Sequence, residues 1–135
     1  MNRVVHFEIH AKDLDKLQKF YQDVFGWDIK SAGPEYGGYR MVMTGKDAPG
    51  AQWPGINGGL TPRTGTVPDG SETVNAFVCT IAVDDIDAYI AKTEKAGGAV
   101  SIEKANVPNV GWLVYMKDPE NNIFGMLQPS MSAAM

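Results

Sequence analysis

The sequence contains an internal repeat, and this feature constrains the fold more than any other. Asp-Leu-Asp at residues 13–15 matches Asp-Ile-Asp at residues 85–87, and Gly26 matches Gly98 at the same offset of 72 residues. In each half the pattern predicts one strand, one helix and then three strands. One such unit buries only one face of its sheet, so two units are expected to pack together. The sequence therefore predicts an α+β fold of two β-α-β-β-β modules in one domain.

The first module, residues 1–60, opens with alternating apolar and polar residues over 4–11, the period of a half-buried strand. Asp13 is the predicted N-cap of the following helix, and Gly26 is its C-cap. The apolar residues of this helix recur at intervals of three and four, as in an amphipathic helix: Leu14, Leu17, Phe20, Tyr21, Val24 and Phe25. The other predicted elements are strands at 27–31, 39–44 and 56–60 and a loop at 46–55.

A linker rich in proline and glycine is predicted at residues 61–73, and the second module follows at 74–129. Its first strand, at 76–83, places Phe77 and Cys79 on the core face. The other predicted elements are a helix between Asp85 and Gly97-Gly98, strands at 99–103, 111–117 and 122–128, and an Asp-Pro-Glu-Asn turn before the last strand. Residues 130–135 are expected to form a flexible tail of a single domain, 1–135.

Composition excludes several classes of protein. The chain has 135 residues, 44% hydrophobic and 21% charged, which suffices for one domain with its own core. Its net charge of −4 argues against nucleic acid and against an anionic membrane as partners. The one cysteine excludes an intramolecular disulfide, and no run of about 18 apolar residues predicts a membrane helix. Because no signal peptide is recognisable either, we expect a cytoplasmic protein.

The first predicted strand carries a polar face. His6, Glu8 and His10 alternate with its apolar residues and so point away from the helix. Neighbouring side chains on one face lie roughly 7 Å apart, so two of them can converge on one ion. Histidine and glutamate are suitable ligands for zinc, iron, nickel or manganese. His6 with Glu8 is therefore a candidate half of a metal site, and the alternative is a solvated polar face.

The equivalent face of the second module differs. An offset of 72 residues places Val78, Thr80 and Ala82 there, and none of them is a good metal ligand. This asymmetry weakens the metal hypothesis, because both halves are expected to contribute. Cys79 lies on the predicted core face, where a buried, unreactive thiol is the expected role.

Three aromatic residues are candidates for contact with a ligand. Trp53 lies in a loop rich in glycine and proline, which predicts a pocket lid. Trp112 and Tyr115 are three residues apart on one predicted strand and so face opposite ways. One of the two is expected to face a ligand and the other the core.

Several segments together resemble the vicinal oxygen chelate superfamily, which contains glyoxalase I, bleomycin resistance proteins and extradiol dioxygenases. The resemblance covers nearly the whole chain, and Gly-Gly-Leu at 58–60 is similar to a bacterial branch of single-chain members. The segments are His-Phe-Glu-Ile at 6–9, Asp-Leu at 13–14, Lys-Phe-Tyr at 19–21, Phe-Gly-Trp at 25–27, Gly-Gly at 97–98 and Asp-Pro-Glu-Asn-Asn-Ile-Phe-Gly at 118–125.

This resemblance implies two curved sheets around a shared cleft, with metal ligands on the first and last strands of each module. His6 matches the first of these positions. Val78 stands at the equivalent position of the second module, and the last-strand positions fall at Gly58 or Gly59 and at Gly125. Only one ligand of four is present, so neither a metal nor another cofactor is expected. The bleomycin resistance branch, which binds its ligand without a metal, is the better match.

We therefore expect a small-molecule binding protein, which the family would make a homodimer. The first alternative is a lyase, isomerase or dioxygenase-like enzyme that uses His6 and Glu8 as acid and base, or recruits a divalent metal with Gln128 added. The second alternative is an interaction module with an empty cleft. The predicted ligand pocket consists of His6, Glu8, His10, Trp53, Thr80, Trp112, Tyr115 and Gln128.

Overall fold

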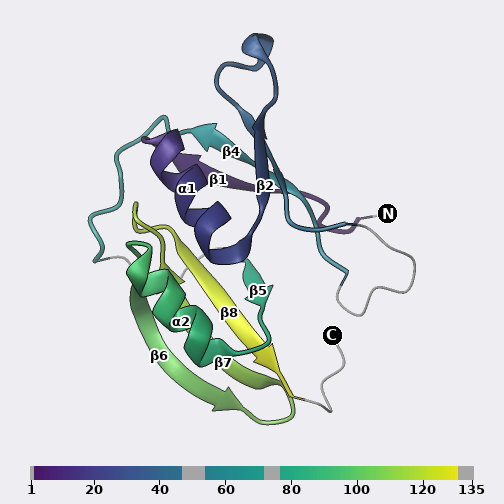
Figure 1. The fold of residues 1–135 in the computed structure, drawn as a ribbon, viewed down its shortest axis with the longest axis vertical. Coiled ribbons are helices and arrows are strands. Elements are labelled where there is room, and N and C mark those ends of the chain that lie inside the picture. Colours follow the sequence, from purple (N-terminus) through teal and green to yellow (C-terminus); the bar gives the residue numbers. More distant parts are fainter. Residues whose placement is uncertain (1, 47–53, 72–76, 131–135) are drawn as a thin grey trace. The chain divides into compact units, whose positions relative to one another are not determined.

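The computed structural model describes residues 2–46, 54–71 and 77–130 (Figure 1). The chain divides into two compact units, Met1–Val67 and Pro68–Met135. Each unit contains one helix and a four-stranded mixed sheet, in the order β-α-β-β-β along the chain. The predicted α+β fold of two such modules is therefore confirmed.

In the first unit, the first and last strands lie side by side. The sheet order is β1-β4-β3-β2, with β1 parallel to β4 and the other pairs antiparallel. A short 3-10 helix, η1, lies in the β2–β3 connection (Figure 1). The elements are β1 Phe7–Ala11, α1 Leu14–Phe25, β2 Asp28–Ser31, η1 Pro34–Tyr36, β3 Arg40–Met43 and β4 Gly58–Pro62.

Helix α1 begins and ends as the sequence predicts. The Asp13 carboxylate accepts a hydrogen bond from the Lys16 backbone N–H at 3.0 Å, which satisfies a free donor of the first turn. Gly26 adopts φ 70°, a left-handed conformation that glycine reaches without steric cost, and its N–H bonds to the Gln22 carbonyl. The buried residues of the helix are Leu17, Phe20, Tyr21 and Val24.

Aromatic rings cluster at the C-terminal end of α1. Trp27 stacks on Tyr21 with ring centroids 5.2 Å apart and an interplanar angle of 3°. Its ring also lies 5.3 Å from Phe25 and 5.9 Å from Phe7 of β1. Because aromatic pairs at such distances add to the free energy gained by burial, this cluster holds β1 against the end of α1.

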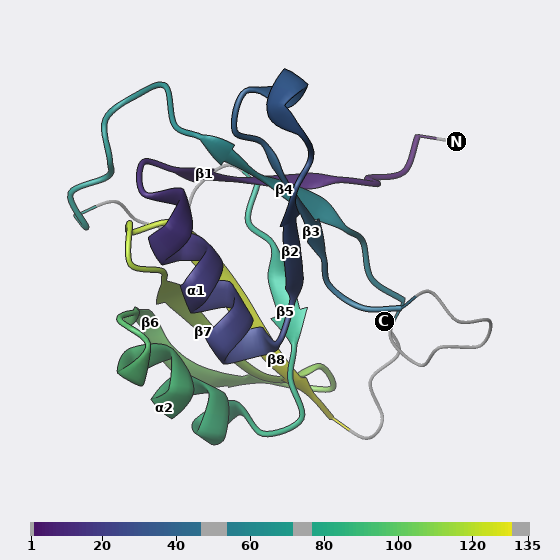
Figure 2. The ribbon, with the colours of Figure 1, turned by 45° about the horizontal axis from the view of Figure 1, so that its top comes forward.

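The second unit repeats the arrangement, with sheet order β5-β8-β7-β6 and β5 parallel to β8. Helix α2 covers one face of this sheet (Figure 2). Its N-cap is Asp85, as predicted, which accepts from the Ala88 N–H at 3.2 Å. The elements are β5 Thr80–Ala82, α2 Ile86–Lys95, β6 Ala99–Val107, β7 Gly111–Lys117 and β8 Ile123–Pro129.

The turn between β7 and β8 is fixed by a buried carboxylate. Asp118 accepts hydrogen bonds from the backbone N–H groups of Glu120 and Asn122, at 2.8 and 3.0 Å. Asn121 adopts φ 63°, and its side-chain amide donates to the Pro68 carbonyl at 2.8 Å. Lys117 donates to the Gly70 carbonyl. The turn therefore also anchors the segment that opens the second unit.

Several predicted boundaries are wrong. β1 begins at Phe7 rather than at residue 4, and Val5, an apolar residue of the alternating stretch 4–11, is 75% exposed. β5 begins at Thr80, and both Phe77 and Cys79 are exposed, contrary to their predicted core positions. β6 is nine residues long and ends at Val107, because it pairs with the whole of β7 through two register shifts. Each first strand pairs over its whole length with the last strand of its unit.

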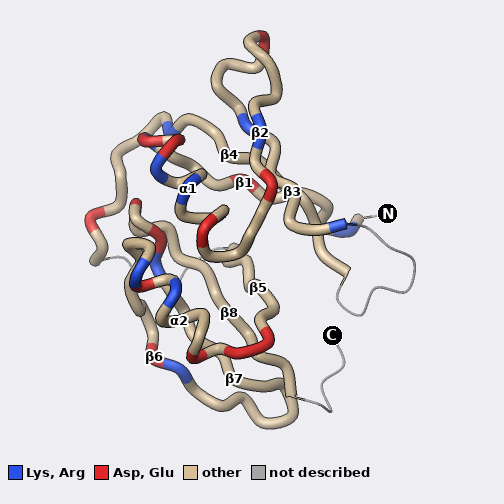
Figure 3. Tube along the Cα trace, viewed as in Figure 1, with Lys and Arg blue, Asp and Glu red and all other residues tan. Residues whose placement is uncertain are grey.

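Charges of both signs are interspersed along α1 and α2 (Figure 3). One ion pair on α1 joins Lys19 to Asp23 at 2.6 Å, the i, i+4 spacing that brings side chains together on a helix. Within the part of the chain that the structure describes, neither helix is long and apolar enough to span a bilayer.

Candidate functional site

The candidate site lies on the helix-free face of the first sheet, the face opposite α1. β-strand register places Glu8 of β1 beside Gly59 of β4, and Gly59 beside Met41 of β3. Paired residues point to the same face, so these three form a row across the middle of the sheet. Phe7 lies on the other face, where its ring packs against Gly58 below α1.

His6 and Tyr39 are hydrogen-bonded across this face. His6 precedes β1 and Tyr39 precedes β3, and the distance from His6 Nε2 to Tyr39 Oη is 2.8 Å. The Glu8 carboxylate lies 4.0 Å from the same His6 nitrogen and also hydrogen-bonds Tyr39. The His6 and Glu8 side chains are 50% and 46% exposed, so both remain accessible to a small molecule. The structure therefore assembles a polar cluster of His6, Glu8 and Tyr39.

Gly59 provides the space in which Tyr39 sits. A Cβ atom at position 59 would overlap the Tyr39 hydroxyl and the ring carbon that bears it. No residue with a side chain fits at position 59 unless Tyr39 moves. The contact explains why a glycine occupies a position within a β-strand, where it packs poorly and costs conformational entropy.

The surroundings of Tyr39 favour its protonated form. Burial is the largest cause that raises the pKa of the Tyr39 hydroxyl, and the nearby Glu8 carboxylate raises this pKa further. A phenol ordinarily ionises near pH 10, so Tyr39 is a neutral phenol at neutral pH. It can therefore donate one hydrogen bond while it accepts another.

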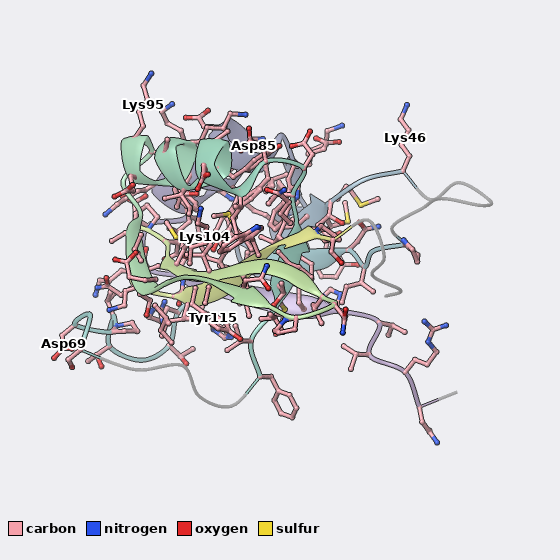
Figure 4. The ribbon with its side chains drawn as sticks, turned by 90° about the horizontal axis from the view of Figure 1, so that it is seen from below. Lys46, Asp69, Asp85, Lys95, Lys104 and Tyr115 are labelled. Atoms are coloured by element: carbon pink, nitrogen blue, oxygen red, sulfur yellow. The ribbon has the colours of Figure 1, made fainter. Side chains whose placement is uncertain are left out.

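The second sheet has a row of the same geometry with different chemistry. Thr80 of β5 pairs with Gly125 of β8, and Gly125 pairs with Tyr115 of β7. A Cβ at Gly125 would lie 2.7 Å from the Thr80 hydroxyl oxygen. Tyr115 lies on the side of the sheet away from α2 (Figure 4). This row has hydroxyl groups but no carboxylate or imidazole.

Two predicted pocket residues lie on the α2 side of the second sheet, opposite Tyr115. Gln128 Oε1 accepts a hydrogen bond from the Ile86 N–H at 2.9 Å, so this side chain caps the start of α2. Trp112 pairs with Gln128, and the Lys104 ammonium lies 4.8 Å from its ring centroid. Lys104 also pairs with Asp87 of α2 at 2.7 Å. Gln128 therefore caps α2, Trp112 contacts a lysine that pairs with α2, and neither shares a face with Thr80.

His10 lies farther along β1 than the residues of the polar cluster. His10 is four residues beyond His6, about 13 Å along an extended chain, and its carbonyl accepts from Arg63. Trp53 lies outside the described residues. The Cys79 residue is exposed to solvent. Its thiol is nevertheless partly desolvated by neighbouring atoms, which raises the pKa of the thiol above the ordinary value. A thiol that stays protonated at neutral pH is a poor nucleophile.

The described residues do not fit a divalent-metal centre within either unit. Among residues 2–46, 54–71 and 77–130, no group of three or more His, Cys, Asp or Glu side chains is placed to hold an ion. Near His6 the second such donor is Glu8, and catalytic zinc commonly has three protein ligands. At Gly59, moreover, the space for a ligand side chain contains the Tyr39 hydroxyl.

Tyr39 is the member of the cluster that sequence reasoning missed. It lies at the boundary of a strand, and nothing in the alternation of residues 39–44 indicates that its ring reaches across β4. The signal that existed was Gly59, since an unexplained glycine inside a strand often marks a close approach by another group.

Comparisons with known proteins agree on the fold and the family. The model of the bleomycin resistance protein-like N-terminal family matches residues 3–45. CFP32 of Mycobacterium tuberculosis, named as a candidate glyoxylase, is 33% identical over 116 residues, or 86% of this chain. The chain spans only 40% of the length of that relative. A candidate lactoylglutathione lyase of Vibrio parahaemolyticus is 28% identical over 98% of this chain and 94% of its own length.

Solved structures extend the comparison. TnmS3, an antibiotic-binding protein of Streptomyces sp. CB03234, superimposes with a TM-score of 0.67 and 27% identity. The match covers 96% of this chain and 98% of TnmS3. The two-module architecture is therefore shared along almost the full length of both proteins.

Proposed function

Because this chain belongs to the vicinal oxygen chelate superfamily of glyoxalases, bleomycin resistance proteins and dioxygenases, we propose that it binds a small organic molecule without a divalent metal. The binding groups are the polar cluster of His6, Glu8 and Tyr39 on the helix-free face of the first sheet. A cytoplasmic location and a homodimeric state are parts of the same proposal.

One observation carries this proposal: the Tyr39 hydroxyl lies above Gly59 and is bonded to His6 at 2.8 Å. His6 Nε2 thus has a protein partner instead of an open coordination position. Glu8 adds a carboxylate that can orient an organic ligand, as polar residues do in small-molecule sites, and Tyr39 holds His6 in place. The similarity to TnmS3, which binds an antibiotic, supports a ligand of this general kind.

The alternative is a lyase or isomerase in which His6 and Glu8 move a proton. The glyoxylase and lactoylglutathione lyase names of two relatives favour it, as does the 4.0 Å separation of His6 Nε2 and Glu8 Oε2. A histidine beside a carboxylate is a pair of groups suited to general acid–base catalysis. Loss of turnover in His6→Ala with ligand binding retained would favour this alternative.

The proposal is tested by a thermal-shift screen of the purified chain against a metabolite and antibiotic panel, with zinc, nickel, iron(II) and manganese as separate additions. We expect at least one organic compound to raise the melting temperature, and the rise to be lost in His6→Ala but kept in the matched variant Val78→Ala. Mass spectrometry after desalting measures bound metal. The proposal that no metal is used would be contradicted if about one metal ion per chain were retained in the wild type and lost in His6→Ala. Light scattering measures the oligomeric state.

A further inference from the structure

The direction of the hydrogen bonds in the polar cluster is fixed by a count of protons. Tyr39 carries one hydroxyl proton and has neighbours on two sides, His6 Nε2 at 2.8 Å and the Glu8 carboxylate. An ionised carboxylate only accepts hydrogen bonds. The Tyr39 proton is therefore directed to Glu8, and the Tyr39 oxygen accepts from His6 Nε2.

This direction determines which nitrogen of His6 is free. A neutral imidazole carries its proton on one nitrogen and a lone pair on the other. If Nε2 carries the proton and donates it to Tyr39, then Nδ1 carries the lone pair. The hydrogen bond made by one ring nitrogen thus sets the tautomer at the other.

The polar side-chain atoms that this cluster leaves for a ligand are then all hydrogen-bond acceptors. They are Nδ1 of His6 and the carboxylate oxygens of Glu8, and both side chains are about half exposed. The negative charge on Glu8 repels an anion and attracts a cation. Tyr39 has committed its only proton, so it offers no donor to a ligand.

We propose that the chain His6–Tyr39–Glu8 makes this face a receptor for hydrogen-bond donors, which selects neutral or cationic molecules bearing N–H or O–H groups over carboxylates. Tyr39 is a positioning residue that acts through His6. The inference rests on the proposed function, because it names the ligand class of that same site.

The first arm of the test measures the His6 tautomer in the ligand-free protein. The chain has two histidines, so two-bond nitrogen–proton NMR of the imidazoles at pH 8.5 gives two simple patterns, and His10→Gln assigns them. We expect His6 to be protonated on Nε2 almost completely, and Tyr39→Phe to give a mixture of tautomers because the acceptor for Nε2–H is lost. A His6 protonated on Nδ1 in the wild type would overturn the inference.

The second arm uses two probes that share one ring, benzylamine as a cationic donor and benzoate as an anionic acceptor. Titration of the same His6 signals is expected to show benzylamine binding about tenfold more tightly, the effect of one charge-assisted hydrogen bond. Glu8→Gln should remove most of the preference, and Val78→Ala should leave it unchanged. Equal or tighter binding of benzoate would overturn the ligand class. The tautomer is measured without ligand, so this result does not depend on the panel screen. Failure of the panel screen would reject the proposed function itself.

Discussion

The two units place the same feature at the same position and surround it with different groups. In each sheet a glycine lies within the last strand, and a hydroxyl from a neighbouring strand region lies against it. Tyr39 covers Gly59 in the first unit, and Thr80 covers Gly125 in the second. Both glycines are therefore explained by close approach of another group, not by a special backbone conformation.

The difference lies in what the hydroxyl touches. Tyr39 is bonded to His6 and lies beside Glu8, whereas Val78 occupies the position equivalent to His6 in the second unit. Both units thus have the backbone geometry of a site. The ionisable groups are present at this position in the first unit and not in the second. A binding or proton-transfer role is supported by the polar residues of the first unit, not by the fold that both units share.

The largest difference between the units is expected in ligand affinity. His6→Ala should weaken binding of the tightest compound from the metabolite panel about 10- to 100-fold, the range for loss of a hydrogen bond to a charged or polarised group. Val78→Ala should change the dissociation constant less than about twofold, within the scatter of neutral surface substitutions. Titration calorimetry measures both. An equal loss in the two variants would remove the asymmetry between the units.

The next effect is on stability. Gly59→Ala forces the Tyr39 ring aside and should lower the free energy of unfolding by about 1–3 kcal/mol, the range for overpacking. Gly125→Ala meets the Thr80 hydroxyl at 2.7 Å, a small group that can rotate, so its cost should stay below about 1 kcal/mol. Urea denaturation measures both. In a Tyr39→Ala background the cost of Gly59→Ala should disappear, and a persistent cost would show that Tyr39 is not the obstacle.

A smaller effect is expected from removal of the hydroxyls alone. Tyr39→Phe keeps the ring but deletes the hydrogen bond to His6, which should cost about 0.5–1.5 kcal/mol. Thr80→Val is the matched change in the second unit and should cost no more than about 1 kcal/mol, because Thr80 is exposed. The same urea titrations apply, and a Tyr39→Phe variant as stable as the wild type would mean that the bond to His6 contributes nothing net.

The smallest effect concerns the ionisation of Tyr39. Glu8→Gln removes a negative charge and should lower the pKa of Tyr39 toward its ordinary value, while burial, the larger cause, keeps it raised. Phenolate absorbance measures this pKa as the difference from the Tyr39→Phe variant. Because the folded state holds this proton more tightly, the stabilisation is complete below the unfolded pKa of about 10 and is lost as pH rises through the folded value. An unchanged pKa would place Glu8 too far away to act.

The repeat, the helices and their caps could be predicted from the sequence because local signals specify them. Asp13, Gly26 and Asp85 are capping residues whose chemistry acts within four residues. The exposure of Val5 and Phe77 could not be predicted, because alternation shows which residues share a face but not where pairing ends. Strand length depends on the partner strand, which lies far away in sequence.

The candidate site was only half predictable for the same reason. His6 and Glu8 follow from the two-residue period of one strand, whereas Tyr39 reaches them across β4 from 33 residues away. Gln128 on the last strand could be assigned to a pocket or to a cap only after its contact with Ile86 was known. Contacts of polar residues between elements are determined by tertiary structure, which the periodicity of a sequence does not reveal.

The parallel pairing of first and last strands also governs how each unit can form. In the order β1-β4-β3-β2, the last strand of the unit lies between the first strand and the β2–β3 pair. Until residues 58–62 have been synthesised, β1 has no partner and β3 has an open edge. Such contacts are distant in sequence and slow to form, and unpaired edges promote association between chains. A fragment that stops before β4 should therefore aggregate. Each sheet can be completed only after its last strand has been synthesised.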